Sequence, residues 1–308
     1  MFRLNAPMAP GIRGDHARTG SEIGTDMPVL LPFRGDNAKD SLFARMNGRL
    51  FIDLKPRHGL MIIAVFALWC GVAEAATQGG LVWAMGSLFE WSPFILKGFA
   101  LNILISIFAM AFGTIAGAAL GLMQVSLMAP VRTSSWIVTQ FFRNSPWLVL
   151  LFCVMLLFPF EIDLGFVVIP IPDWVKAVIG FSLPIMANIS EVVRGAVVSL
   201  PSGQWESAES LAFSRRQTMW MIILPQCVKR MIPPWINWYC ILTMATPLCS
   251  IMGVEESVGH TVQAMNALGD RPELLGPFYF FLLFIHFVFT YPIARYSITL
   301  EKKFAVKI

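Results

Sequence analysis

Four charged or polar residues interrupt stretches of sequence that are otherwise apolar. Arg143 and Asn144 stand shortly before Pro146, and Glu191 and Arg194 lie three residues apart in a later stretch. Polar groups are costly inside a membrane, so their presence there suggests a function. An acid and a base three residues apart on a helix also neutralise each other. Two interpretations therefore stay open: a structural ion pair, or side chains that line a polar pathway.

A second candidate site is the polar segment at residues 201–225. A short helix over 203–213 would carry an apolar stripe, because apolar residues recur there every three positions. The stripe consists of Trp205, Ala208 and Leu211. Its polar face would carry Glu206 and Glu209, whereas a helix lying on a membrane surface is expected to carry Lys or Arg there. The acidic face therefore indicates docking to a protein partner in the cytoplasm.

Two further patterns concern local structure. Ser214 followed by Gln217 predicts a capping box, which would end the first short helix and begin another. Three glycines are spaced by four and would share one helix face; they are Gly113, Gly117 and Gly121. Small residues at this spacing let two helices approach closely. The spacing predicts helix packing, either within the chain or at a subunit interface.

No catalytic constellation is visible. The sequence has no G-x-x-x-x-G-K-[ST], no H-E-x-x-H and no G-x-S-x-G, and it has no pattern typical of nucleic-acid binding. His286 stands alone in an apolar stretch, which predicts a hydrogen-bonded core residue. The five cysteines lack C-x-x-C spacing and are interpreted as small apolar fillers. We therefore predict a chain without enzymatic activity and without a metal or cofactor of its own.

Composition defines the elements that would position these residues. Hydrophobic residues make up 56% of the 308 residues and charged residues 14%, whereas a soluble domain usually has about 25% charged residues. The chain is therefore interpreted as an all-α membrane protein with several spans. Apolar segments of about the ~20 residues that a bilayer requires predict six spans. They cover residues 59–76, 94–123, 136–158, 174–200, 234–252 and 277–298.

Charge indicates the orientation of these spans. With the amino terminus in the cytoplasm, the cytoplasmic segments hold fifteen Lys and Arg at residues 1–57, 132, 215–216 and 302–307 together, while the external loops hold Arg271 alone. The external loops would also hold acidic residues, including Glu255 and Glu256. Such a bias is typical of cytoplasmic loops, and it predicts six spans with both termini inside.

The predicted spans divide the chain into four parts. Residues 1–57 form a polar tail without helical periodicity, which we predict to be largely disordered in the cytoplasm. Residues 58–92 would form one transmembrane helix and an external loop. Residues 93–300 would form the main transmembrane domain, and residues 301–308 a short cytoplasmic tail.

The segment at 201–225 resembles the signature E-A-A-x3-G-x9-I-x-L-P of permease subunits of ATP-binding-cassette (ABC) importers. The matching residues are Glu206, Ala208, Ile222, Leu224 and Pro225. Ser207 replaces the first alanine, and Ala212 replaces the glycine that supplies a turn after the helix.

Other segments resemble one branch of that family. Residues 142–146 are similar to the F-R-N-T-P of polar amino acid permeases of the histidine and glutamine type, and residues 191–195 are similar to their E-I-V-R-G. The resemblance covers roughly residues 93–300. One departure lies at 242–248, where L-T-M-A-T-P-L stands in place of the frequent L-K-D-T-S-L.

The resemblance implies a MetI-like fold, the five-span core of a type I importer, with one added amino-terminal span. It implies a permease of the bacterial inner membrane that pairs with a second copy or a sister permease. Two ATPase subunits would use ATP, and a periplasmic binding protein would deliver an amino acid.

The resemblance also implies an ATPase-coupling helix that includes Glu206, Ser207, Ala208 and Ala212, and the apolar pattern adds Trp205 and Leu211 as its anchors. The alternative is a self-contained, ion-coupled secondary transporter or channel. It would couple through intramembrane charges such as Glu191 and Arg194.

Overall fold

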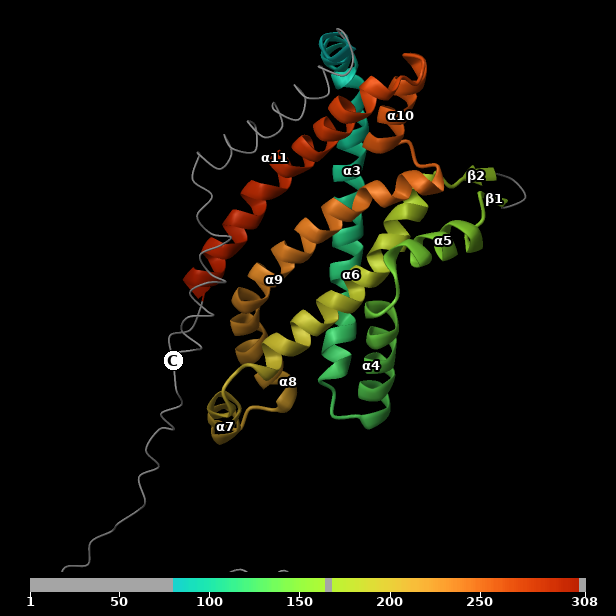
Figure 1. Cartoon of the computed structure of the whole chain (residues 1–308). Coiled ribbons are helices and arrows are strands. Elements are labelled where there is room, and N and C mark those ends of the chain that lie inside the picture. The colour runs from blue at the N-terminus through green and yellow to red at the C-terminus, as the bar shows by residue number, and fades with distance from the viewer. Residues whose placement is uncertain (1–79, 164–167, 305–308) are drawn as a thin grey trace, which may run out of the picture. The chain divides into compact units, whose positions relative to one another are not determined.

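The structure is a computed structural model that describes residues 80–163 and 168–304. The predicted tail at 1–57, the predicted first span at 59–76 and residues 305–308 lie outside the described residues. The described part is almost entirely helical, and Figure 1 shows the arrangement of its elements.

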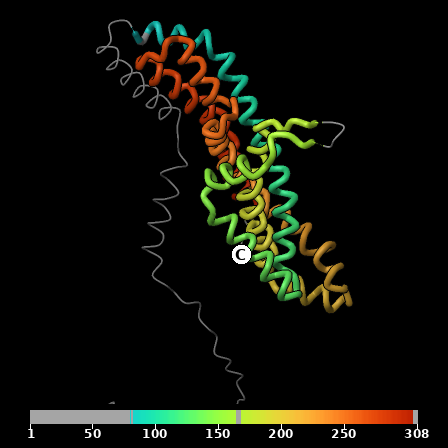
Figure 2. Tube along the Cα trace, turned by 90° about the vertical axis from the view of Figure 1, so that its right-hand side faces the viewer, coloured from blue at the N-terminus to red at the C-terminus, as the bar shows by residue number. Residues whose placement is uncertain are grey.

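The first half of the described chain contains four helices and one hairpin. They are α3 (Gly80–Gln124), α4 (Ala129–Arg143), α5 (Trp147–Leu157), β1 (Glu161–Asp163), β2 (Val168–Pro170) and α6 (Asp173–Val198). The antiparallel strands pair Ile162 with Ile169, and the hairpin projects from the helices in Figure 2. The described residues are otherwise helical, as the prediction of an all-α fold requires, and this hairpin of two three-residue strands is the exception among them.

The second half begins with the short elements of the predicted loop. They are α7 (Ser202–Ser210), α8 (Arg215–Gln217) and a π-helical segment, η1 (Thr218–Ile223). The remaining elements are α9 (Leu224–Ala245), the 3-10 segment η2 (Thr246–Met252), α10 (Ser257–Ala267) and α11 (Pro272–Phe304).

Three helices, α3, α6 and α11, are each long and apolar enough to cross a membrane. Two bent pairs, α4 with α5 and Arg215–Met252 with α10, raise the number of candidate spans in the described residues to as many as five. The predicted segments at 174–200 and 277–298 are thus each one helix. The count of six spans and the orientation of the termini stay predictions.

The predicted span at 136–158 is not one straight helix. It is divided between α4 and α5, whose axes differ by 101°. Pro146 has no backbone N–H and disfavours helical geometry at the residue before it, so the chain turns at residues 144–146. Hydropathy alone does not report this break, because apolar residues continue on both sides of it.

The last part of the predicted external loop is helical, since α3 begins at Gly80, and its external location stays a prediction. The first turns of α3 are stabilised by tertiary packing: Ala84 and Leu88 join a buried cluster with Leu274 and Phe278 of α11. A second cluster occupies the space between α3, α5, α6 and α9, with Phe181 and Ile185 of α6 completely buried.

The three glycines of α3 lie against α6. A Cβ atom at Gly117 would come within 2.7 Å of the Met186 carbonyl oxygen, and one at Gly121 within 2.7 Å of the Ser190 carbonyl oxygen. At Gly113 it would come within 2.5 Å of Cγ2 of Ile185. The structure therefore places this face in packing within the chain.

Replacing Gly117 by Ala is expected to lower the melting temperature of the protein in detergent. The added methyl group meets backbone atoms of α6, which cannot rotate away, and such overpacking costs about 1–3 kcal/mol. Gly86→Ala is the matched control on the same helix, because nothing lies within 4 Å of its added Cβ. That variant should gain about 1 kcal/mol from helix propensity. Shifts of the same sign in both variants would contradict the packing argument.

Candidate functional site

The short helix α7 is held between the ends of α6 and α9. Ala208 is 1% exposed, and Trp205 packs beside a buried cluster that contains Leu200 and Ile223. Gln226 donates from Nε2 to Oε1 of Gln204 at 3.2 Å, which joins α9 to α7. The helix is therefore fixed on its inner side by both neighbouring spans.

The outer side of α7 is polar and exposed. Glu206, Ser207 and Glu209 all face outward. Leu211 is also 71% exposed, so the expected three-residue stripe packs within the chain at only two of its positions. The physical reason is that α7 ends at Ser210, and the backbone then leaves the helical path that would have carried Leu211 inward.

Ala212 adopts the left-handed backbone conformation, with φ of 57°. Its N–H donates to the Glu209 carbonyl oxygen at 2.9 Å, and the Phe213 N–H donates to the Ala208 carbonyl oxygen at 3.1 Å. These two bonds form a Schellman motif, which usually has glycine at the left-handed position. The turn that a glycine would supply is thus made here by an alanine.

Replacing Ala212 by Gly is expected to slow amide hydrogen exchange in residues 203–213. The left-handed conformation costs a residue with a Cβ about 1–2 kcal/mol, and glycine relieves that cost. Ser207→Gly is the matched control in the same loop, because it lies inside α7, where glycine weakens the helix. Exchange should therefore become faster in that control. Faster exchange in both variants would contradict the assignment of strain to Ala212.

The predicted capping box at Ser214 is confirmed. Oγ of Ser214 accepts from the Gln217 N–H at 3.4 Å, and the Ser214 N–H donates to Oε1 of Gln217 at 2.9 Å. The Arg215 guanidinium then lies 4.9 Å above the Trp205 ring. The loop therefore consists of two short helical segments connected by a fixed turn.

Three of the four predicted polar residues meet at the junction of α4 and α6. Arg194 donates from Nη2 to Oε2 of Glu191 at 2.7 Å, and Nη1 of Arg143 lies 3.6 Å from the same oxygen. The carboxylate side chain is 14% exposed and lies between two guanidinium groups. Asn144 does not join them, because its Nδ2 donates to the Gln140 carbonyl oxygen at 2.7 Å.

This ionic cluster carries one net positive charge. Its two arginine side chains are 45% and 41% exposed, so both remain accessible to a ligand or solvent. The sequence reveals the Glu191–Arg194 spacing, but Arg143 reaches the pair only through the packing of α4 on α6. Guanidinium and carboxylate groups together can bind a ligand that carries both charges.

A buried polar cluster around Glu256 escaped the sequence analysis. Glu256, which the charge pattern placed in an external loop, is completely buried. Its Oε2 accepts from Nδ2 of Asn102 at 2.8 Å and from Oγ of Ser257 at 2.9 Å. Its Oε1 accepts from the N–H groups of Val258 and Gly259 at 3.0 and 3.3 Å, at the start of α10.

This cluster joins three elements that are distant in the sequence. Nδ2 of Asn102 in α3 also donates to Oγ1 of Thr246 at 3.0 Å, and Oδ1 of Asn102 accepts from the Ser257 N–H at 3.0 Å. Thr246 begins η2 and belongs to the segment that departs from the family pattern. The available signal was Asn102 itself, a polar residue in the middle of an apolar span.

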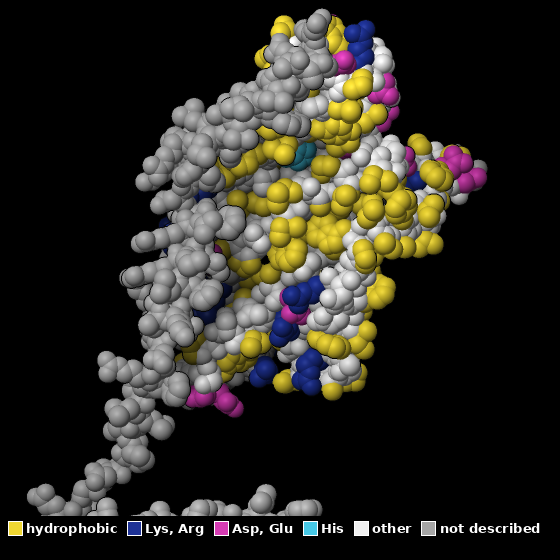
Figure 3. Space-filling model, viewed as in Figure 1, with side chains coloured by type: hydrophobic (Ala, Val, Ile, Leu, Met, Phe, Trp, Pro, Cys, Tyr) yellow, Lys and Arg dark blue, Asp and Glu magenta, His cyan; other side chains and the backbone are white. Residues whose placement is uncertain are grey.

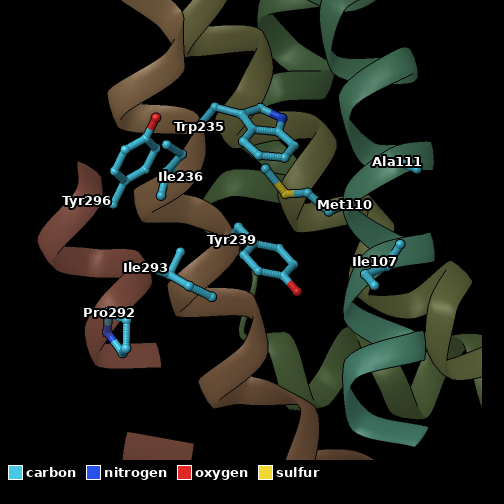
Figure 4. A pocket seen from close by; sticks show the side chains of 9 residues that line it. All are labelled: Ile107, Met110, Ala111, Trp235, Ile236, Tyr239, Pro292, Ile293 and Tyr296. Atoms are coloured by element: carbon cyan, nitrogen blue, oxygen red, sulfur yellow. The ribbon is translucent and has the colours of Figure 1, made fainter. Parts of the chain in front are cut away.

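An apolar cavity of about 610 Å³ opens between α3, α9 and α11. Figure 4 shows Trp235 and Tyr239 extending from α9 toward α3. The lining residues are Ile107, Met110, Ala111, Trp235, Ile236, Tyr239, Pro292, Ile293 and Tyr296. Nε1 of Trp235 donates to Oγ1 of Thr114 at 2.8 Å, which fixes the indole ring. No charged side chain lines the cavity, so it suits apolar groups.

The remaining candidates have structural roles. Nδ1 of His286 lies 2.9 Å from the Leu282 carbonyl oxygen, and its ring meets Phe99 edge to face. Cys227, Cys240 and Cys249 are buried free thiols. Within residues 80–163 and 168–304, no group of three His, Cys, Asp or Glu side chains could hold a metal ion.

The sequence is similar to a family of membrane transport proteins. Residues 109–294 match the family described as "Binding-protein-dependent transport system inner membrane component". The probable amino-acid ABC transporter permease protein YckA of Bacillus subtilis (strain 168) is 34% identical over 216 residues, which cover 70% of this chain and 91% of that protein. The inner membrane amino-acid ABC transporter permease protein YhdY of Escherichia coli (strain K12) is 33% identical, over 67% of this chain and 55% of that longer protein.

Two solved structures share the fold. A chain from the crystal structure of an amino acid ABC transporter with histidines superposes with a TM-score of 0.60 at 20% identity, covering 70% of this chain and 97% of the other. A chain of an inward-facing MetNI methionine ABC transporter gives a TM-score of 0.51 at 14% identity, over 73% and 99% of the two chains. The helices described above therefore form a known permease arrangement.

Proposed function

Because the chain belongs to the family of binding-protein-dependent transport system inner membrane components, we propose that it is the permease subunit of an ATP-driven amino acid importer. The assignment as an ABC importer permease for amino acids rests on this family and on the relatives named above. The finer assignment concerns its partners, its coupling and its translocation path.

The observation that carries the coupling proposal is the geometry of α7. The helix is packed against its own spans on one side and presents Glu206, Ser207 and Glu209 on the other. We infer that this outer face, with the turn at Ala212, docks on a separate ATPase subunit. Two such subunits would bind and hydrolyse ATP, so this chain would need no cofactor of its own.

Coupling would work by alternating access. A ligand shifts a conformational equilibrium only by its differential affinity for the two states, and ATP binding by the ATPases would supply that difference. The motion would reach α6 and α9 through α7. Trp205 of α7 packs beside Leu200, just after the end of α6, and Gln226 of α9 is hydrogen-bonded to α7.

The ionic cluster of Arg143, Glu191 and Arg194 is the candidate polar contact on the translocation path. An amino acid carries an ammonium and a carboxylate, and the cluster offers one carboxylate with guanidinium nitrogens of Arg194 and Arg143 at 2.7 and 3.6 Å from it. A second permease copy or a sister permease would complete the path, and a periplasmic binding protein would deliver the substrate. The complex would lie in the bacterial inner membrane. This chain would cross that membrane six times and have both termini in the cytoplasm.

The test has two stages. The tagged chain is first purified from its native membranes in a mild detergent, and co-purifying proteins are identified by mass spectrometry. A P-loop ATPase in about equal amount is expected. The recovered complex is then placed in proteoliposomes, where the binding protein and internal ATP should drive uptake of a radiolabelled amino acid.

Recovery of the chain alone in several detergents would contradict the proposal. Uptake driven by an ion gradient without ATP would then favour the secondary transporter. In that case Glu191→Gln should abolish the ion dependence, because Glu191 is the acidic member of the ionic cluster.

A further inference from the structure

Two adjoining cavities open where the ends of α3, α4, α6 and α7 meet α8. Each has a volume of about 370 Å³, and they share Ser126, Leu127 and Arg215 among their lining residues. Four arginines surround them; they are Arg132, Arg194, Arg215 and Arg216. No aspartate or glutamate lines either cavity. These two cavities together form the arginine pocket.

The positive charge of the arginine pocket is largely uncompensated. Arg194 is paired with Glu191. Among the described residues, Arg132, Arg215 and Arg216 form no ion pair with a carboxylate. Arg215 instead lies over the Trp205 ring, which orients its guanidinium group. A planar guanidinium binds phosphate through two parallel hydrogen bonds, so the pocket suits a phosphate group.

Exposed apolar side chains border the same pocket. Leu127, which lines both cavities, is 70% exposed, and Trp220, which lines one, is 59% exposed. Trp136, one turn after Arg132 on α4, is 52% exposed. Figure 3 shows dark-blue basic side chains together below a belt of yellow hydrophobic ones, toward one end of the described helices. Basic residues beside exposed Trp and Leu are typical of the level of lipid headgroups.

We propose that the arginine pocket binds the headgroup of an anionic phospholipid, with the acyl chains lying along Leu127 and Trp220. Basic pockets between transmembrane helices on the cytoplasmic side are known to bind such headgroups. A small soluble anion would use the arginines and leave the apolar border without a partner. An acidic protein surface would meet the exposed side of α7 first, and that side carries Glu206 and Glu209.

The bound lipid would connect the loop to the spans. Arg132 is in α4 and Arg215 in α8, so one phosphate would hold these two elements together. Arg215 also contacts Trp205 of α7, so the lipid would stabilise the position of α7 itself. The content of anionic lipid in the membrane would thereby regulate the loop, whatever solute the spans carry.

The inference is tested by native mass spectrometry of the full-length chain in detergent, titrated with phosphatidylglycerol or phosphatidylcholine of matched acyl chains. Phosphatidylglycerol should bind at least 10-fold more tightly. The double variant Arg132→Gln with Arg215→Gln should weaken its binding by about 30-fold, since each basic residue near the surface contributes roughly a factor of five. The matched control, Lys302→Gln with Lys303→Gln, removes equal charge from the end of α11 and should change binding less than 2-fold.

Four results would overturn the proposal. Equal binding of the two lipids would show that the headgroup charge is not recognised. Unchanged binding in the double variant, with a melting temperature equal to that of the parent, would place the lipid elsewhere. Competition by inorganic phosphate or glycerol phosphate at the affinity of the whole lipid would identify a site for a free anion. Displacement of the lipid by an added ATPase subunit, with the same arginine dependence, would identify a protein interface instead.

Discussion

Replacement of Glu256 by Gln is expected to destabilise the protein by about 1–3 kcal/mol, because one buried donor loses its acceptor. The four groups around the carboxylate all donate to it, two to each oxygen. An ionised carboxylate has two oxygens with four acceptor positions. The glutamine amide keeps one acceptor oxygen and has an NH₂ donor group in place of the other. If the amide NH₂ replaced Oε1, it would face two backbone N–H donors. If it replaced Oε2, the Ser257 hydroxyl could turn to accept from it, and Nδ2 of Asn102 would still be opposed by a donor. The yield of monodisperse protein in detergent and its thermal unfolding curve measure the effect.

The neighbouring residue supplies the control for this variant. Glu255 is exposed, and its Oε1 accepts from Nε2 of Gln263 at 3.1 Å on the surface. Glu255→Gln makes the same chemical change and should leave the unfolding curve within experimental error. An unfolding curve of Glu256→Gln that matches both the control and the parent would show that the buried cluster contributes little to stability.

Replacement of Glu206 by Lys is expected to reduce ATP-driven uptake by 100-fold or more while the spans stay folded. The side chain is exposed on α7, and within the described residues it forms no ion pair. Its loss therefore costs the isolated chain little, since surface charges far from partners change stability by only a few tenths of a kcal/mol. At a docking surface, reversal of a charge places like charges together at a cost of several kcal/mol. Uptake in proteoliposomes and the amount of co-purified ATPase are the two measurements.

A matched charge reversal lies at the far end of the chain. Glu301 is exposed in the last turns of α11, away from α7, so Glu301→Lys should retain uptake and ATPase recovery. If Glu206→Lys transports normally, α7 is not the coupling surface and the assignment of its outer face is wrong. If the melting temperature of Glu206→Lys is also much lower than that of the parent, the lost uptake results from unfolding and not from lost coupling.

The elements that could be predicted are those with a local signal. The helices α6 and α11 follow from long apolar runs, and the capping box follows from Ser214 and Gln217 alone. The bend between α4 and α5 carried a signal at Arg143, Asn144 and Pro146, but the apolar residues on both sides of it favoured one span. The early start of α3 depends on contacts with α11, which lies almost 200 residues away in the chain.

In the candidate site, too, only residues with a local sequence signal could be predicted. The Glu191–Arg194 pair is local and was recognisable by its spacing. The burial of Glu256 was not predicted, because its partner Asn102 is 154 residues away and nothing adjacent to Glu256 indicates burial. Leu211 fitted the stripe by spacing, but the turn at Ala212 removes it from the buried face. Periodicity describes a helix only as far as the helix continues.

The bend of α3 has a consequence for what stands outside the bilayer. Pro93 lies inside this helix, and Figure 2 shows the first turns of α3 running at an angle to the rest of it. Residues 93–124 extend about 48 Å at 1.5 Å per residue, whereas a helix tilted by 40° needs about 39 Å to cross a hydrocarbon core about 30 Å thick. If the Gln124 end lies at headgroup level beside the arginine pocket, the turns before Pro93 lie beyond the hydrocarbon core, where they pack against α10 and the start of α11. A protein that approached from that side would meet these packed helices before it reached the hydrocarbon core.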